Sequence, residues 1–175
     1  MSDTKYTLFE EYYRPGDDAS RVFHEGMEDY VQSATGIFES CCALCESPIE
    51  KLFLAALVTR MRVEMDCYFL AFDKVPRKQN LHSAIVVCVP QVKIGKYRVD
   101  FLLLDDRGSK QKLTVIECDG HDFHERTKEQ AARDRSRDRW FAAQGISVLR
   151  FTGSEVYNDP FGVADEVASW LARTA

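Results

Sequence analysis

Two short stretches decide the fold: Tyr97-Arg98-Val99-Asp100-Phe101 and Val115-Ile116-Glu117-Cys118-Asp119-Gly120. Each has the composition of a β-strand and places one acidic residue, Asp100 or Glu117, among apolar neighbours. A buried carboxylate is costly unless something compensates its charge, and two carboxylates on adjacent strands repel each other. We therefore expect a divalent cation between Asp100 and Glu117. Their oxygen ligands suit Mg²⁺ or Mn²⁺, which can activate water and bind a phosphate.

Length and composition fit one globular domain. The chain has 175 residues, of which 45% are hydrophobic, and this is enough for a core. No apolar run is long enough to span a bilayer, and the polar residues 1–11 do not resemble a signal peptide. The cysteines are therefore expected to be reduced and the protein cytoplasmic. Cys42 and Cys45 form half of a zinc motif, which no second pair completes.

The net charge of −5 is unevenly distributed along the chain. Residues 1–50 include three basic and eleven acidic residues, whereas residues 51–175 include twenty basic and seventeen acidic ones. The carboxylate pair thus lies in a mildly basic part, which allows a local surface for nucleic acid. The acidic N-terminal part could mask that surface, bind a protein partner, or bind a second copy of the chain.

Periodicity and turn residues predict the order of the elements. Residues 20–44 and 125–144 have helical patterns, and Ser47-Pro48-Ile49-Glu50 is a capping box that begins another helix. Strand patterns cover residues 67–72, 84–89, 96–104, 112–118 and 146–151, and a closing helix covers residues 161–171. We expect residues 1–46 to form an acidic lead and helix, and residues 47–175 to form the catalytic domain.

This order, together with the spacing of the two acids, resembles the PD-(D/E)XK nuclease superfamily. It resembles more closely a family of uncharacterised proteins related to very short patch repair endonucleases. The matching stretches, within residues 47–170, are Ser47–Glu50, Gln91–Phe101, Val115–Gly120, Asp134 with Arg137, and Gly145–Phe151. The resemblance implies an α/β, restriction-endonuclease-like αβββαβ core with an extra helix at each end. It also implies an endonuclease that uses Mg²⁺ or Mn²⁺ and acts on DNA.

The resemblance also assigns residues to the site. The expected metal ligands are Asp100, Glu117 and the main-chain carbonyl of Cys118, whose thiol would point into the core. Members of the superfamily usually have a lysine in place of Asp119, which orients or deprotonates the attacking water. Asp119 could instead bind the metal or cap the turn that follows it. Glu50 could point at the metal, as first-helix acids of the superfamily often do, or serve only the capping box.

The following helix or the loop before it could replace the missing lysine. Lys128 and Gln130 are the helix candidates, and at most one of them points into the site because residues two apart lie on different helix faces. We favour Gln130, because it shares a face with Phe141, and read Lys128 as a solvated charge. His121 or His124 in the loop could also move a proton, or could simply be surface residues.

The same helix is rich in arginine. Arg133, Arg135 and Arg139 could track DNA phosphates, or could form a solvated face with i,i+4 ion pairs. Two functions follow for the whole chain. The first is a metal-dependent DNA endonuclease, and the second is a catalytically inactive module of the same fold that binds nucleic acid or protein. Asp119 in place of the lysine and the acidic N-terminal helix favour the second function.

Overall fold

The computed structural model describes residues 18–64, 67–69, 86–119 and 128–174. The chain divides into two compact units, Met1–Gly36 and Ile37–Ala175, and the division falls within helix α2 (Asp18–Cys42). α2 matches the helix predicted over residues 20–44 to within two residues at each end. The predicted start of a catalytic domain at residue 47 stays a prediction.

The second unit contains one five-stranded sheet with the order β1-β2-β3-β4-β5. Its strands are β1 (Cys67–Phe69), β2 (Val86–Ile94), β3 (Tyr97–Asp105), β4 (Lys112–Asp119) and β5 (Ser147–Thr152). β2, β3 and β4 form an antiparallel meander, while β1 pairs in parallel with β2 and β5 in parallel with β4. The predicted α/β core with its three-stranded meander is confirmed.

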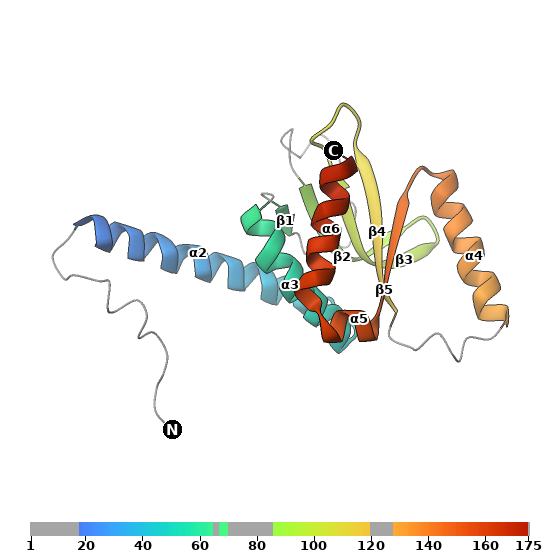
Figure 1. The fold of residues 1–175 in the computed structure, drawn as a ribbon, viewed down its shortest axis with the longest axis horizontal. Coiled ribbons are helices and arrows are strands. Elements are labelled where there is room, and N and C mark those ends of the chain that lie inside the picture. Colours follow the sequence, from blue (N-terminus) through green and yellow to red (C-terminus); the bar gives the residue numbers. More distant parts are fainter. Residues whose placement is uncertain (1–17, 65–66, 70–85, 120–127, 175) are drawn as a thin grey trace, which may run out of the picture. The chain divides into compact units, whose positions relative to one another are not determined.

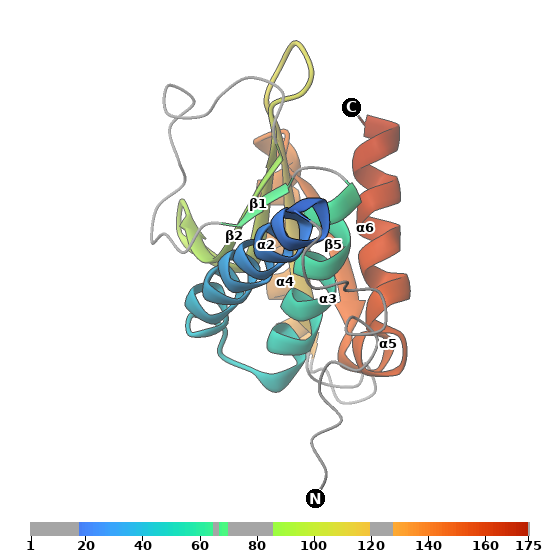
Figure 2. The ribbon, with the colours of Figure 1, turned by 90° about the vertical axis from the view of Figure 1, so that its left-hand side faces the viewer.

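Helices cover both faces of this sheet (Figure 1). α3 (Pro48–Glu64) and α6 (Pro160–Thr174) lie on one face, and α4 (Lys128–Ala143), which connects β4 to β5, lies on the other. Figure 2 shows α3 and α6 side by side, as their contacts also indicate. Within the described ranges, no helix combines the length and the apolar character that a membrane crossing requires.

One helix was not expected from the sequence. α5 (Gly153–Asn158) follows β5 directly and begins with a complete capping box between Thr152 and Glu155. The sequence signal for this cap was present, because threonine and glutamate stand three residues apart. Six residues are too few to show a helical period, which is why the periodicity did not reveal α5.

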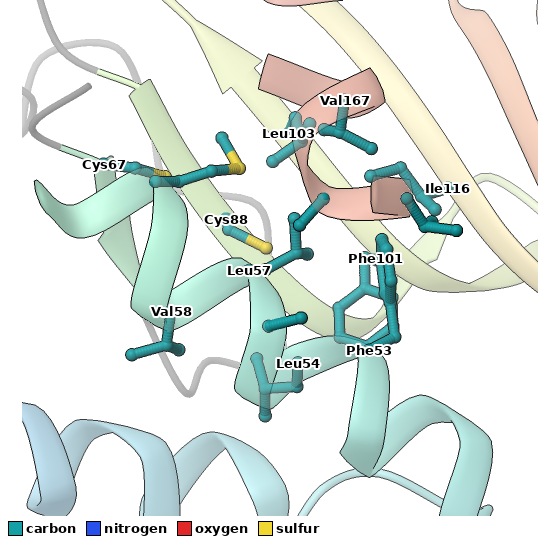
Figure 3. Packing of buried hydrophobic residues seen from close by; sticks show 14 of the residues in the cluster. Phe53, Leu54, Leu57, Val58, Cys67, Cys88, Phe101, Leu103, Ile116 and Val167 are labelled. Atoms are coloured by element: carbon teal, nitrogen blue, oxygen red, sulfur yellow. The ribbon is translucent and has the colours of Figure 1, made fainter. Parts of the chain in front are cut away.

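The larger core lies between the sheet and helices α3 and α6 (Figure 3). Phe53 of α3 packs edge-on against Phe101 of β3, with ring centroids 5.3 Å apart. Phe101 and Leu103 face this core, whereas Leu102 and Leu104 face a second core between the sheet and α4. All four residues are fully buried, which confirms that the run after Asp100 is buried on both faces.

Aromatic packing attaches the β2–β3 hairpin to α4. Gly95 at the tip of the hairpin has a φ of 58°, and a Cβ there would lie 2.7 Å from two ring carbons of Trp140. Tyr97 packs against Trp140 and Phe141, with centroid distances of 5.3 and 5.6 Å. The hairpin tip therefore needs glycine for both its backbone conformation and its close approach to α4.

We expect Gly95→Ala to lower the free energy of unfolding by about 1–3 kcal/mol, because alanine is strained at positive φ and its methyl group collides with Trp140. Urea unfolding followed by circular dichroism measures this change. Gly108→Ala is the matched control, since the nearest atom to its new Cβ lies 3.9 Å away. The control should stay within about 0.5 kcal/mol of wild type. Equal stability of the two variants would contradict the packing of the hairpin on α4.

Candidate active site

The two acidic strands separate at Asp100 and Glu117. The last pair of the β3–β4 ladder is Phe101 with Ile116, so Asp100 and Glu117 occupy the next position of the same register. Beyond this position, β3 stays paired with β2 and β4 stays paired with β5. The structure thus brings the two predicted metal ligands together where the strands diverge. We call this position the fork.

A slip in side-chain alternation accompanies the fork. Val89 and Val92 of β2 both face the core under α4, although residues three apart in a regular strand face opposite sides. Val99 and Leu102 of β3 behave in the same way. Gln91, which lies between the two valines of β2, has a φ of 53° and absorbs the slip. In the outer half of the hairpin, the alternation of side chains between the two faces of the sheet is therefore shifted by one residue. This shift begins at the fork.

Asp100 is held by the main chain of β4. The Cys118 N–H donates to Oδ2 of Asp100 at 2.7 Å. The β3–β4 ladder has ended by this point, so the Asp100 side chain takes the place of a main-chain acceptor for the Cys118 N–H. Burial raises the pKa of Asp100, and the hydrogen bond from Cys118 opposes that rise. The Cys118 thiol lies in the larger core, as expected, and its burial raises its pKa well above the usual range.

Glu117 is held by α4. Its Oε1 accepts from Nη2 of Arg137, and the same Nη2 donates to the main-chain oxygen of Arg98 at 2.6 Å. Arg137 therefore connects the two sides of the fork, and its guanidinium lies over the rings of Tyr97 and Phe141. Burial raises the pKa of Glu117 to about 8, and the positive charge of Arg137 opposes this rise.

Arg137 shows that the chain itself supplies part of the positive charge that the two carboxylates require. The family resemblance includes Arg137, and the helix spacing places Arg137 on the face of Phe141, four residues further on. Neither predicts its contacts with Glu117 and Arg98. Phe141 is fully buried, so that face packs against the sheet.

Glu50 at the start of α3 is the third carboxylate of this region, and like Glu117 it is buried. Ser47 Oγ accepts from the Glu50 N–H at 3.2 Å, which is the first half of the predicted capping box. The second half differs from the prediction, because the Glu50 carboxylate accepts from the Glu46 N–H at 2.8 Å and from Gln91 Nε2 at 2.7 Å. Its negative charge raises the pKa of Asp100. Glu50 is therefore oriented toward β2 and the fork.

Each of these three carboxylates is held through one oxygen. Oδ1 of Asp100, Oε2 of Glu117 and Oε1 of Glu50 accept no hydrogen bond from the described residues. Such free carboxylate oxygens are suitable ligands for a hard cation.

The donors near the fork fit a cation that keeps several water ligands. Among the described residues, no three His, Cys, Asp or Glu side chains are placed to hold a metal ion by themselves. Two carboxylates with a main-chain carbonyl, from Asp100, Glu117 and Cys118, would be the protein ligands. Mg²⁺ is commonly held by one or two carboxylates, with water and substrate phosphate in its remaining positions. The residues present therefore fit Mg²⁺ or Mn²⁺.

Asp119 ends β4 and lies opposite Thr152 of β5. It is half-buried, and its charge raises the pKa of both Asp100 and Glu117. It therefore contributes to the negative potential of the fork. Whether it binds metal or caps the next turn stays open, because the turn lies outside the described residues.

The remaining predicted residues belong to the loop and to α4. His121 and His124 lie outside the described residues, as do the side chains of Lys128 and Gln130, so their roles stay predictions. The three arginines proposed to contact phosphates are exposed on α4: Arg133, Arg135 and Arg139. Their exposure leaves them accessible to DNA.

The fold and the fork define a protein of the restriction-endonuclease-like class. The family model REase_MTES_1575 matches residues 78–171, more than half of the chain, and the chain belongs to this restriction-endonuclease-like family. The matched region includes Asp100, Glu117 and Arg137 and leaves out Glu50. No curated protein and no solved structure matches the chain.

The raised pKa of Glu117 predicts that the metal-free protein loses stability as pH rises. An acid with a raised folded-state pKa stabilises fully below its unfolded value of 4.5, and this contribution is lost as pH rises toward about 8. In EDTA, Glu117→Gln should flatten this decline by up to about 1.4 kcal/mol per pH unit. Urea unfolding across this pH range measures the slope.

The exposed Glu166 of α6 provides the control for this experiment. Glu166→Gln should keep the wild-type slope, because it changes an exposed side chain on α6 and leaves the fork unaltered. A wild-type slope for Glu117→Gln would contradict a folded-state pKa of Glu117 that lies above its unfolded value.

Proposed function

We propose that this protein is a metal-dependent endonuclease that hydrolyses phosphodiester bonds in DNA. The observation that supports this most directly is the pairing of Asp100 and Glu117 at the fork, each held through one oxygen while the other accepts no hydrogen bond from the described residues. Membership of a restriction-endonuclease-like family supports a nuclease. The closer relationship to proteins that resemble very short patch repair endonucleases is part of this proposal.

Asp100, Glu117 and the Cys118 carbonyl would bind Mg²⁺ or Mn²⁺ in this proposal. A bound metal would polarise the attacking water and neutralise charge that develops on the phosphate. Arg137 holds Oε1 of Glu117 and leaves Oε2 for the metal. The Cys118 N–H holds Oδ2 of Asp100 and leaves Oδ1. The protein thus orients both ligands beforehand, which reduces the conformational cost of metal binding.

We expect the protein to nick supercoiled plasmid with Mg²⁺ or Mn²⁺ and to be inactive in EDTA. Asp100→Asn and Glu117→Gln should each lower the rate by at least about 100-fold, because each removes a metal ligand. Calorimetry should show metal binding that Asp100→Ala abolishes. Glu166→Gln, an exposed acid on α6, should keep wild-type activity. A wild type that cuts no DNA with either metal would contradict the proposal.

Asp119 stands where the superfamily usually has lysine, so another residue must orient the water or the metal must act alone. We expect Gln130→Ala to lower kcat by about 10- to 100-fold with little change in KM or metal affinity, because water positioning acts mainly on the transition state. Lys128→Ala, His121→Ala and His124→Ala are measured in parallel, since each could do the same. Full activity in all four variants would show that none of these residues orients the attacking water and that the metal alone activates it.

The second candidate function is a catalytically inactive module that binds nucleic acid or protein. Two observations favour it: Asp119 replaces the lysine, and the Arg137 guanidinium already provides Glu117 with a cation. The plasmid and calorimetry experiments distinguish the two functions. An inactive module would bind no Mg²⁺ or Mn²⁺ at Asp100 and would leave the plasmid intact.

A further inference from the structure

The outer part of the β2–β3 hairpin is basic, and the proposed chemistry does not use it. Lys93, Lys96 and Arg98 are exposed, and the segment from Gln91 to Val99 contains no acidic residue. Lys93 and Arg98 are directly opposite each other in the ladder, so their side chains share one face of the hairpin. We call these three residues the hairpin cations.

The hairpin cations lie close to the fork. Arg98 precedes Asp100 by two residues in β3, which in an extended strand is a distance of roughly 7 Å. Packing of Gly95 and Tyr97 on Trp140 and the hydrogen bond from Arg137 to the main chain of Arg98 fix the hairpin against α4 (Figure 1). The positive charges are therefore held beside the carboxylates and do not depend on a free loop.

Arg98 already binds an anion of the chain. Its Nη1 lies 2.5 Å from Oε1 of Glu46, and the two side chains are 52% and 62% exposed. An ion pair this exposed contributes little to stability, so an external anion can replace the carboxylate. The pair shows that the hairpin surface accepts an oxyanion. It also identifies Glu46 as a competitor for that position.

We propose that the hairpin cations bind backbone phosphates of duplex DNA next to the bond cleaved at the fork, and that Glu46 competes with DNA for Arg98. This inference rests on the proposed function. Contacts between cationic side chains and phosphates set the register and orientation of a duplex on a protein. The chain as a whole carries a charge of −5, so a local group of cations is needed to attract DNA to this position.

The test measures binding of a fluorescent DNA duplex by anisotropy over a range of KCl concentrations in EDTA, so that no cleavage occurs. Lys93→Ala/Lys96→Ala/Arg98→Ala should weaken binding and flatten the slope of log Kd against log KCl by roughly two to three, because each phosphate contact contributes about 0.9. The matched control removes three exposed cations from the far end of the sheet and from the end of α6: Lys110→Ala/Lys112→Ala/Arg173→Ala. It should keep the wild-type slope.

Glu46→Gln gives a test in the opposite direction. It removes the competing carboxylate and leaves the Glu46 N–H that holds Glu50, so binding should tighten by up to about five-fold. Equal slopes for wild type and the hairpin variant, or equal weakening by the hairpin and control variants, would overturn the inference. Such a result leaves the endonuclease proposal standing if the wild type cuts plasmid, whereas a wild type that neither binds nor cuts DNA overturns both.

Discussion

The cost of burying Glu117 and of partly burying Asp100 is the constraint on which the arrangement around the fork depends. A main-chain N–H compensates Asp100 and a guanidinium compensates Glu117. Both donors come from elements that the apolar cores hold in place, since Cys118 lies in the larger core and Arg137 stacks on Phe141 of the smaller one. The same packing thus buries the carboxylates and positions the donors that compensate their charge. If β3 and β4 stayed paired at this position, the two carboxylates would lose these donors, and their burial would be too costly.

The irregularity that opens the fork is itself stabilised elsewhere. Gln91 adopts a positive φ that costs energy for a residue other than glycine, and its side chain donates to the buried carboxylate of Glu50. The far end of the hairpin is fixed by Trp140 of α4. The hairpin is thus held at both ends, by α3 through Glu50 and by α4 through Trp140. Helices on both faces of the sheet determine where β3 leaves β4.

Local patterns predicted the strands and the two acids, because strand composition and a carboxylate among apolar residues are visible in a single segment. The contacts of Arg137, Gln91 and Glu50 could not be predicted in this way. Each joins residues far apart in the chain: Arg137 reaches Arg98 and Glu117, and Gln91 reaches Glu50. The capping box illustrates the difference. The hydrogen bond from the Glu50 N–H to Ser47 is local and formed as predicted, whereas the Glu50 side chain accepts from Gln91, which is distant in the sequence. α5 could not be predicted for another reason: its capping box is visible in the sequence, but six residues are too short to show the hydrophobic periodicity of a helix.

The Arg137 guanidinium favours the inactive module but is not sufficient to exclude a metal, because it occupies only Oε1 of Glu117. The charge balance of the fork is more informative. Four acids act there, namely Glu50, Asp100, Glu117 and Asp119, while Arg137 provides a direct positive contact and Arg150 is paired with Asp138. A DNA phosphate would be repelled from this position unless a cation neutralised it. An inactive DNA-binding module would gain nothing from such a site, whereas a metal-dependent nuclease requires its free carboxylate oxygens.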